Sequence, residues 1–139
     1  MEQKQDKHET NQPAKLYRGF TNLSAYEVVF PIVIHTVQLL QSCKRENKEG
    51  EFIDLIDKAQ AKAVSVIASL ADGYNKYHAE DKVVLYSKAR SNVSHTQALV
   101  LILSALGVVP ENAASKIVAN FDEKMKVFNG LIRKMEDKA

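Results

Sequence analysis

The sequence contains no tryptophan, one cysteine, three prolines and five glycines among 139 residues. The single cysteine, Cys43, excludes an internal disulfide and any Cys-x-x-Cys metal or redox pair. So little turn chemistry argues against a sandwich or barrel of many short strands. The chain also lacks the run of about 20 mainly apolar residues that a membrane-spanning helix needs, and no apolar signal segment follows Met1. We therefore expect a soluble, cytoplasmic protein.

The charges are nearly balanced, with 19 basic and 17 acidic side chains and a net charge of +2. This balance gives no proof of a nucleic-acid partner, although it leaves room for a local basic patch. The length and the 45% apolar content are typical of one globular domain. Residues 1–15 are polar and show no apolar periodicity, which predicts a disordered tail followed by one domain over residues 16–139.

The first predicted helix begins near Ser24. The tetrapeptide Ser24–Glu27 has the form of a capping box, in which the serine hydroxyl accepts a first-turn N–H and the glutamate reaches back. The segment 28–34 is rich in β-branched residues and has strand propensity, but Pro31 cannot donate to a β-ladder. Helical periodicity continues beyond it, so we expect a helix kinked near Pro31 that ends near Cys43.

Three more stretches have apolar residues at helical spacing. The second helix is predicted over about 51–72 and ends at Gly73, and the third runs over about 80–106 and is closed by Gly107. The fourth opens at Pro110 and carries the most regular alternation of four and three steps in the chain. Four helices with short connections predict an all-α, antiparallel up-down-up-down four-helix bundle.

The third predicted helix has two unlike halves. Residues 90–97 are polar at seven of eight positions, whereas residues 98–106 are apolar at eight of nine. A helix that is apolar all round must be buried on more than one side. One small bundle does not easily supply that burial, so we expect contacts between copies of the chain.

The sequence offers little catalytic chemistry. None of His8, His35, His78 and His95 has a carboxylate in the Glu-x-x-His arrangement of di-iron bundles, and local hydrolase and nucleotide-binding motifs are missing. We expect His35 to be a core or interface histidine. The sequence predicts no metal, no cofactor and no enzymatic activity; an enzyme would require His35 or His95 to share a cavity with Asp72.

Basic residues are the main candidates for binding. They gather around the second connection and on the fourth helix, where they could contact phosphates, or could simply form a solvated face of mixed charge. An oligomer would repeat each modest patch. The candidate nucleic-acid-binding residues are Lys76, Lys82, Lys88, Arg90, Lys126, Arg133 and Lys134. Tyr74, Tyr77 and Tyr86, near the first group, could stack bases or pack at an interface.

Several segments resemble a known family of small helical proteins. The segment 65–74 (SVIASLADGY) corresponds to a Ser-Ile-x-x-Asn-Ile-Ala-Glu-Gly-aromatic motif, and 89–93 (ARSNV) to an Ala-Arg-Gly-Ser-aliphatic motif. The run 130–132 (GLI) and the pattern of aromatic and leucine residues over 20–26 are also similar. On these motifs the chain, over residues 20–135, resembles the four-helix-bundle proteins encoded within intervening sequences of ribosomal RNA genes. The accessory variability determinant (Avd) of diversity-generating retroelements belongs to the same structural group.

This resemblance implies a homopentameric barrel of bundles and, for Avd-like members, nucleic-acid binding (RNA or DNA) and partnership with a reverse transcriptase. The chain departs from the motifs at Ser69, where the family has asparagine, at Asp72, where it has glutamate, and near His95, where it has an acidic residue. We interpret Asp72 and Arg90 as an inter-helix pair that orients two helices. The predicted function is a non-enzymatic, oligomeric nucleic-acid-binding scaffold; the alternative is a protein-interaction or regulatory bundle without nucleic-acid binding.

Overall fold

The structure, a computed structural model, describes residues 19–47 and 49–139; the predicted tail, residues 1–15, lies outside them. Within these residues the chain is all-helical and has no strand. The elements are a 3-10 turn η1 (Phe20–Asn22) and the helices α2 (Ser24–Glu46), α3 (Ile53–Tyr74), α4 (Ala79–Ala105) and α5 (Glu111–Lys138). The prediction of an all-α fold with four helices is confirmed.

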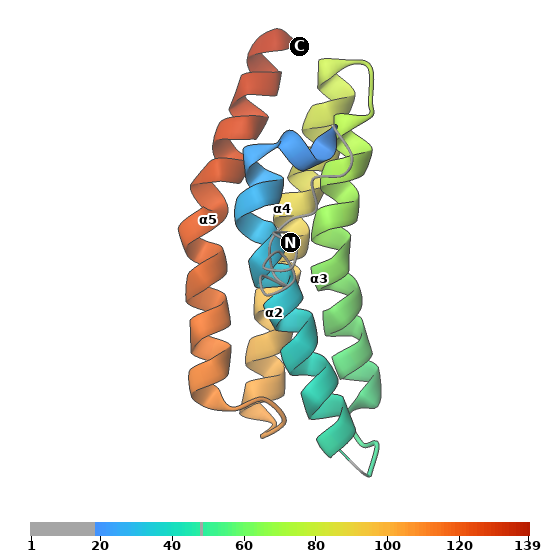
Figure 1. Ribbon diagram of the computed structural model, residues 1–139, viewed down its shortest axis with the longest axis vertical. Helices are drawn as coiled ribbons and strands as arrows, with labels where there is room; N and C mark the ends of the chain where they lie inside the picture. Colours follow the sequence, from blue (N-terminus) through green and yellow to red (C-terminus); the bar gives the residue numbers. More distant parts are fainter. Residues whose placement is uncertain (1–18, 48) are drawn as a thin grey trace, which may run out of the picture.

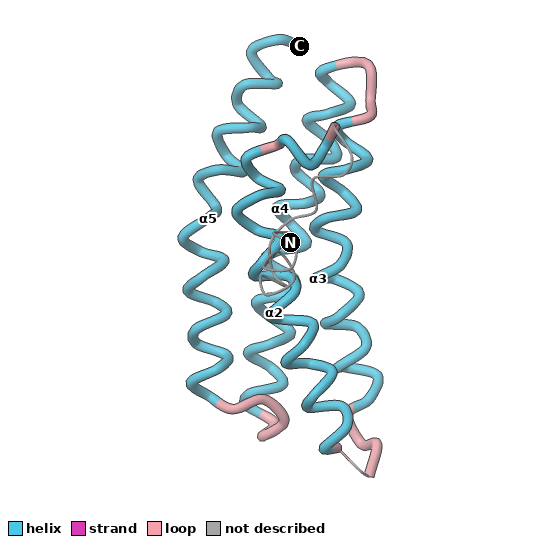
Figure 2. The backbone as a smooth tube through the Cα atoms, viewed as in Figure 1, coloured by secondary structure: helices cyan, strands magenta, loops and turns pink. Residues whose placement is uncertain are grey.

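The four helices lie side by side with short connections (Figures 1 and 2). Helices α2 and α4 each pack against both α3 and α5, so α2 and α4 stand at opposite corners of the bundle, as do α3 and α5. Each helix runs antiparallel to the one before it. One end of the bundle, the turn end, carries the α3–α4 connection and the C-terminus; the other, the loop end, carries the α2–α3 and α4–α5 connections.

The core follows the periodicity of the sequence. All four helices contribute to a large apolar cluster that includes Val29, Val66, Tyr86 and Phe121. A second cluster fills the loop end around Leu103. On α5, the buried residues are Ala114, Ile117, Phe121, Phe128 and Ile132, which all belong to the predicted apolar stripe.

Helix α2 begins where the sequence predicts, but not by the predicted cap. Leu23 is the N-cap residue in an extended conformation, no side chain caps the helix, and Ser24 is already its first residue. The N–H of Glu27 bonds to the carbonyl of Leu23 at 3.1 Å. The capping-box prediction is therefore wrong, because the N-cap position lies one residue earlier than predicted. Leu23, which directly follows η1, occupies it. The same helix contains Pro31, so the predicted helix, rather than a strand, is confirmed there.

Gly73 lies inside α3 and does not end it, contrary to the prediction. The helix continues to Tyr74, and Gly73 is buried. A Cβ atom at Gly73 would lie 2.8 Å from Cε1 of Tyr86 and 3.1 Å from Cβ of Leu85. The glycine is there because α4 packs too closely for a side chain. Gly107, in contrast, has φ 82° and follows α4 as predicted.

The two helical glycines Gly73 and Gly130 predict opposite effects of the same substitution. Gly73→Ala forces its Cβ into the Tyr86 ring, so we expect the free energy of unfolding to fall by about 1–3 kcal/mol. At Gly130 a Cβ would meet nothing within 4 Å, so Gly130→Ala should raise it by about 0.5–1 kcal/mol through better helix propensity. Urea unfolding followed by circular dichroism measures both. A Gly73→Ala protein as stable as the wild type would contradict the close-packing role.

Candidate nucleic-acid interface

The seven candidate cations divide between two regions of the bundle. Lys76, Lys82, Lys88 and Arg90 lie on the α3–α4 turn and the first half of α4, whereas the others lie on the second half of α5. The structure therefore does not gather the seven into one patch. Their hydrogen bonds and ion pairs decide which of them can reach a ligand.

Lys82 is engaged within its own chain. Its ammonium donates to the carbonyl of Tyr74 at 2.6 Å and to that of Gly73 at 3.3 Å, and lies 5.4 Å from the centroid of the Tyr74 ring. Burial, and then the positive charge of Lys138, lower the pKa of Lys82. A lysine on the last carbonyls of a helix complements the negative end of the helix dipole. Lys82 thus locks the end of α3 to the start of α4.

The predicted pair of Asp72 and Arg90 does not form. Arg90 donates to Oδ1 of Asn129 on α5 at 2.8 Å, whereas Asp72 lies 3.7 Å from the ammonium of Lys76. The two side chains diverge because Arg90 is on the α5 side of α4 and Asp72 is on α3, the opposite neighbour of α4. The prediction is wrong because it assumed that Arg90 faces α3. The rotation of α4 about its own axis turns Arg90 toward α5, and the sequence alone did not specify this rotation.

A groove between the start of α2 and the second half of α5 has exposed cations on its α5 side, and we call it the α2–α5 groove. It has a volume of about 350 Å³ and is flanked by Lys126 and Lys134, with Gly130 between them on α5. Lys126, Arg133 and Lys134 are exposed, and no ion pair within residues 19–47 and 49–139 involves them. The groove is lined by Asn22, Leu23, Ser24, Ala25, Lys126, Val127, Gly130, Leu131 and Lys134.

A second groove, between α3 and α4, holds Lys88 beside Lys62, which the sequence analysis did not single out. The carboxylate of Asp72 lines the same groove, and so does Asn92, whose amide donates to Oγ of Ser69 at 3.2 Å. Lys62 could have been noticed because it stands three residues before Ser65 and seven before Ser69, on one polar strip of α3. The acidic neighbour makes this groove less favourable for phosphate than the α2–α5 groove.

The three tyrosines of the candidate interface have different surroundings. Tyr86 is buried in the core of the bundle and packs against Gly73, so the prediction that it could stack a base is wrong. One face of Tyr74 carries the ammonium of Lys82. Tyr77, in the α3–α4 turn, is 90% exposed, and its ring meets that of His78 edge-on with centroids 4.9 Å apart.

The second half of α4 carries an exposed apolar face. Leu101, Ile102 and Leu106 are between 44% and 49% exposed, while Leu103 and Val100 of the same segment are buried. The α4 face, as we call these three exposed side chains, points away from the bundle core. A neighbouring groove of about 390 Å³ between α4 and α5 is lined by Leu101, Ser104, Ala105, Glu111, Ala114 and Ser115. This exposure agrees with the expectation that one copy of the chain does not bury the whole segment.

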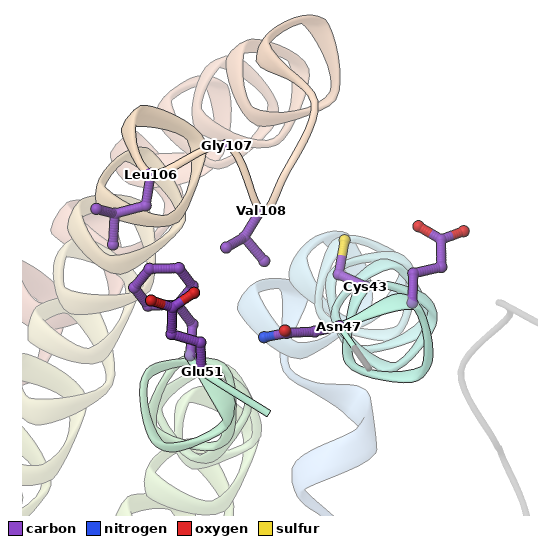
Figure 3. Close-up of a pocket in the computed structure, with 8 residues that line it drawn as sticks. Cys43, Asn47, Glu51, Leu106, Gly107 and Val108 are labelled. Carbon is purple, nitrogen blue, oxygen red and sulfur yellow. The ribbon is translucent and has the colours of Figure 1, made fainter. Parts of the chain in front are cut away.

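A pocket of about 290 Å³ opens at the loop end, where α2, α3 and the α4–α5 connection meet (Figure 3). Cys43 contributes its thiol from one wall and Val108 faces it. Burial, followed by the negative charge of Glu46, raises the pKa of Cys43. The thiol is therefore held protonated near neutral pH, which makes it a poor nucleophile. The buried amide nitrogen of Asn47 has no hydrogen-bond partner in the described part of the chain.

The histidines give no support to a catalytic centre. His35 is exposed, so of its two predicted places the core is wrong and the interface stays a prediction; His95 is exposed as well. Asp72 lines the groove that holds Lys88 and a second groove formed with Lys76, Asp81, Val84 and Leu85, and no histidine is among the residues that line either groove. Residues 19–47 and 49–139 hold no cluster of three or more His, Cys, Asp or Glu able to bind a metal ion. In the same residues no helix has the length and apolar character to cross a bilayer.

Comparisons with protein-family models, with curated proteins and with solved structures gave no match to the chain. The resemblance to the family of ribosomal intervening-sequence proteins stays a prediction.

Proposed function

We propose that the protein is a self-associating helical scaffold that binds nucleic acid through the α2–α5 groove. One observation carries the proposal: the α4 face and the α2–α5 groove lie on different sides of the bundle, since α4 stands at the corner opposite α2. Copies that associate through α4 leave the lysines of the groove open to solvent. The same assembly multiplies a patch that is modest in one copy.

The α2–α5 groove has the chemistry of a phosphate-contact site. Lys126 and Lys134 are eight residues apart, which is about 12 Å along the helix axis. Gly130, between them, exposes its backbone with nothing within 4 Å of its Cβ position. Because glycine in an exposed helix costs about 1 kcal/mol relative to alanine, its presence favours close approach of another molecule there. Asn22 and Ser24 add neutral hydrogen-bonding groups on the opposite wall.

The assembly part of the proposal is supported by the exposure of the α4 face. An apolar surface of this kind on a small domain marks a contact with another protein surface. Charge does not oppose contact between two copies, since residues 91–110 contain no Lys, Arg, Asp or Glu. The family resemblance extends the proposal to a pentameric ring and to a reverse transcriptase as partner.

Neutralising the two lysines of the groove together with Arg133, which adjoins Lys134 in sequence, tests the proposal. The triple variant Lys126→Gln, Arg133→Gln, Lys134→Gln should lose affinity for a fluorescent 30-nucleotide RNA in anisotropy titrations. Between 50 and 200 mM salt, the slope of log affinity against log salt should become shallower by about 2 if each cation releases its share of counterions. The matched control is Lys58→Gln, Lys116→Gln, Lys124→Gln, which removes the same charge elsewhere. Equal affinity of the two triple variants for the RNA would contradict the proposal that the α2–α5 groove binds nucleic acid.

The alternative, a protein-interaction module without nucleic-acid binding, is favoured by the α4 face alone. In that case the wild type binds no RNA or DNA at 50 mM salt, while substitutions on α4 abolish capture of a protein partner. The two functions are therefore separated by the same titration.

A further inference from the structure

Tyr77 is the most exposed of the large apolar side chains in the described part of the chain, at 90%. Its position is nevertheless ordered by hydrogen bonds on both sides. The N–H of Lys76 bonds to the carbonyl of Gly73, and those of Asp81 and Lys82 bond to the carbonyl of His78. The side chain of Lys82 adds its two bonds to the end of α3. The aromatic ring is thus held out into solvent by a short, pinned turn.

The packing of the ring leaves a flat surface free. Tyr77 and His78 meet at 82°, so the histidine supports the tyrosine without covering both of its faces. Tyr74 is less available because Lys82 stands over its ring, and Tyr86 is buried. Among these three, Tyr77 is the most exposed, at 90% against 37% for Tyr74, and it offers an open ring face at the turn end of the bundle.

The charges around Tyr77 are mixed. Lys76 precedes the ring and pairs with Asp72, while Glu80 and Asp81 lie in the first turn of α4. A surface of this balance does not track a phosphate backbone by itself. It does accept the uncharged face of a base, since stacking on an aromatic ring needs no cation.

The α3–α4 turn and the last cations of α5, Lys134 and Lys138, belong to the same end of the molecule. Helix α5 ends beside the α3–α4 turn (Figure 1), and Lys138 is near enough to Lys82 to act on its charge. Lys134 is one turn before Lys138 on α5. A chain held by Lys134 at the α2–α5 groove can therefore continue over the turn end of the bundle.

We propose that Tyr77 is a stacking platform for unpaired bases, so that the protein prefers single-stranded over double-stranded nucleic acid. This inference builds on the proposed function and names the form of its ligand. Bases inside a duplex are stacked on one another and do not reach a protruding ring, whereas unpaired bases do. The phosphates are held at the α2–α5 groove, and Tyr77 discriminates between single-stranded and double-stranded nucleic acid.

The test compares an unstructured 20-nucleotide oligouridine with a 20-base-pair RNA duplex, both labelled and titrated at 50 mM salt. Tyr77→Ala should weaken binding of the single strand by about 5- to 150-fold and change duplex binding less than twofold. Tyr77→Phe keeps the ring and should bind like the wild type. Tyr77→Leu keeps apolar bulk without the ring and should behave like Tyr77→Ala.

A second readout follows from the absence of tryptophan. Tyr77→Trp places a single indole at the turn, and its fluorescence should fall when the oligouridine binds; Val64→Trp, on the outer side of α3, should not respond. If Tyr77→Ala binds the single strand like the wild type, or loses both forms equally, the stacking role is overturned while the groove stands. If the wild type binds neither form, the proposed function fails together with it.

Discussion

The double substitution Leu101→Glu, Ile102→Glu should convert the proposed assembly into a single 15.6 kDa chain. Both side chains are nearly half exposed in one copy, so the glutamates do not disturb the core of the monomer. In the proposed contact they place carboxylates in a surface that carries no opposite charge over residues 91–110. Uncompensated charges at a buried position cost about 3–5 kcal/mol, so association should weaken at least about 100-fold.

Sedimentation velocity over 1–100 µM measures this change, with circular dichroism to show that the helices persist. Val64→Glu, Val84→Glu provides the matched control, because Val64 and Val84 are 53% and 65% exposed and the pair introduces the same two charges outside the second half of α4. The control should sediment like the wild type. A wild-type protein that sediments as a single chain across the whole range would remove the assembly from the proposal.

Phe121→Ala and Phe128→Ala will be the two most destabilising single substitutions to alanine on α5. Each phenylalanine is 1% exposed and lies in the main cluster between the four helices. Truncation removes the apolar contact and leaves a cavity that a helical bundle closes only in part. The expected loss is about 3–5 kcal/mol in the free energy of unfolding.

Assembly would complicate this measurement, since association stabilises the folded state by an amount that rises with the logarithm of protein concentration. Phe121→Ala is therefore best compared with its parent in the Leu101→Glu, Ile102→Glu background by urea unfolding. Val64→Ala is the control, and an exposed site of this kind should change stability by less than about 0.5 kcal/mol. A loss below 1 kcal/mol for Phe121→Ala would contradict the packing of α5.

The helices themselves were predictable because their stabilisation is local in pattern. On α5, the four-and-three spacing that includes Phe121 and Phe128 selects one face whatever the neighbours are, and that face is the buried one. The partial exposure of the apolar half of α4 was predictable for the opposite reason, because a segment with no polar side has no unique face to bury. Its side chains accordingly divide between the core, as Leu103 does, and solvent, as Ile102 does.

What failed depended on how neighbouring elements approach one another. Gly73 has the residue type of a helix end, and only the position of Tyr86 on α4 shows that it serves close packing instead. The supposed pair of Asp72 and Arg90 depended on the rotation of α4. Because residues 90–97 are polar on nearly every side, the sequence did not specify which of them faces α3 and which faces α5.

The candidate site was only partly predictable. The distribution of basic residues in the sequence identified Lys126 and Lys134 as candidates for phosphate contact. It identified Lys82 equally, although the ammonium of Lys82 is bound to carbonyl groups of α3. The exposure of Tyr77 was also invisible, because helical spacing does not extend into a turn. In each case the missing information is the hydrogen bonding of a connection, which periodicity does not encode.

The separation of the α4 face from the α2–α5 groove has a consequence for the path of a bound strand. If copies join through α4, each groove faces the outer circumference of the particle rather than a central hole. A long strand would wrap around the outer surface of the assembly, and the length of strand protected from nuclease would increase with each added copy. Entry would then need no free end, so a closed circle would be bound as readily as a linear strand.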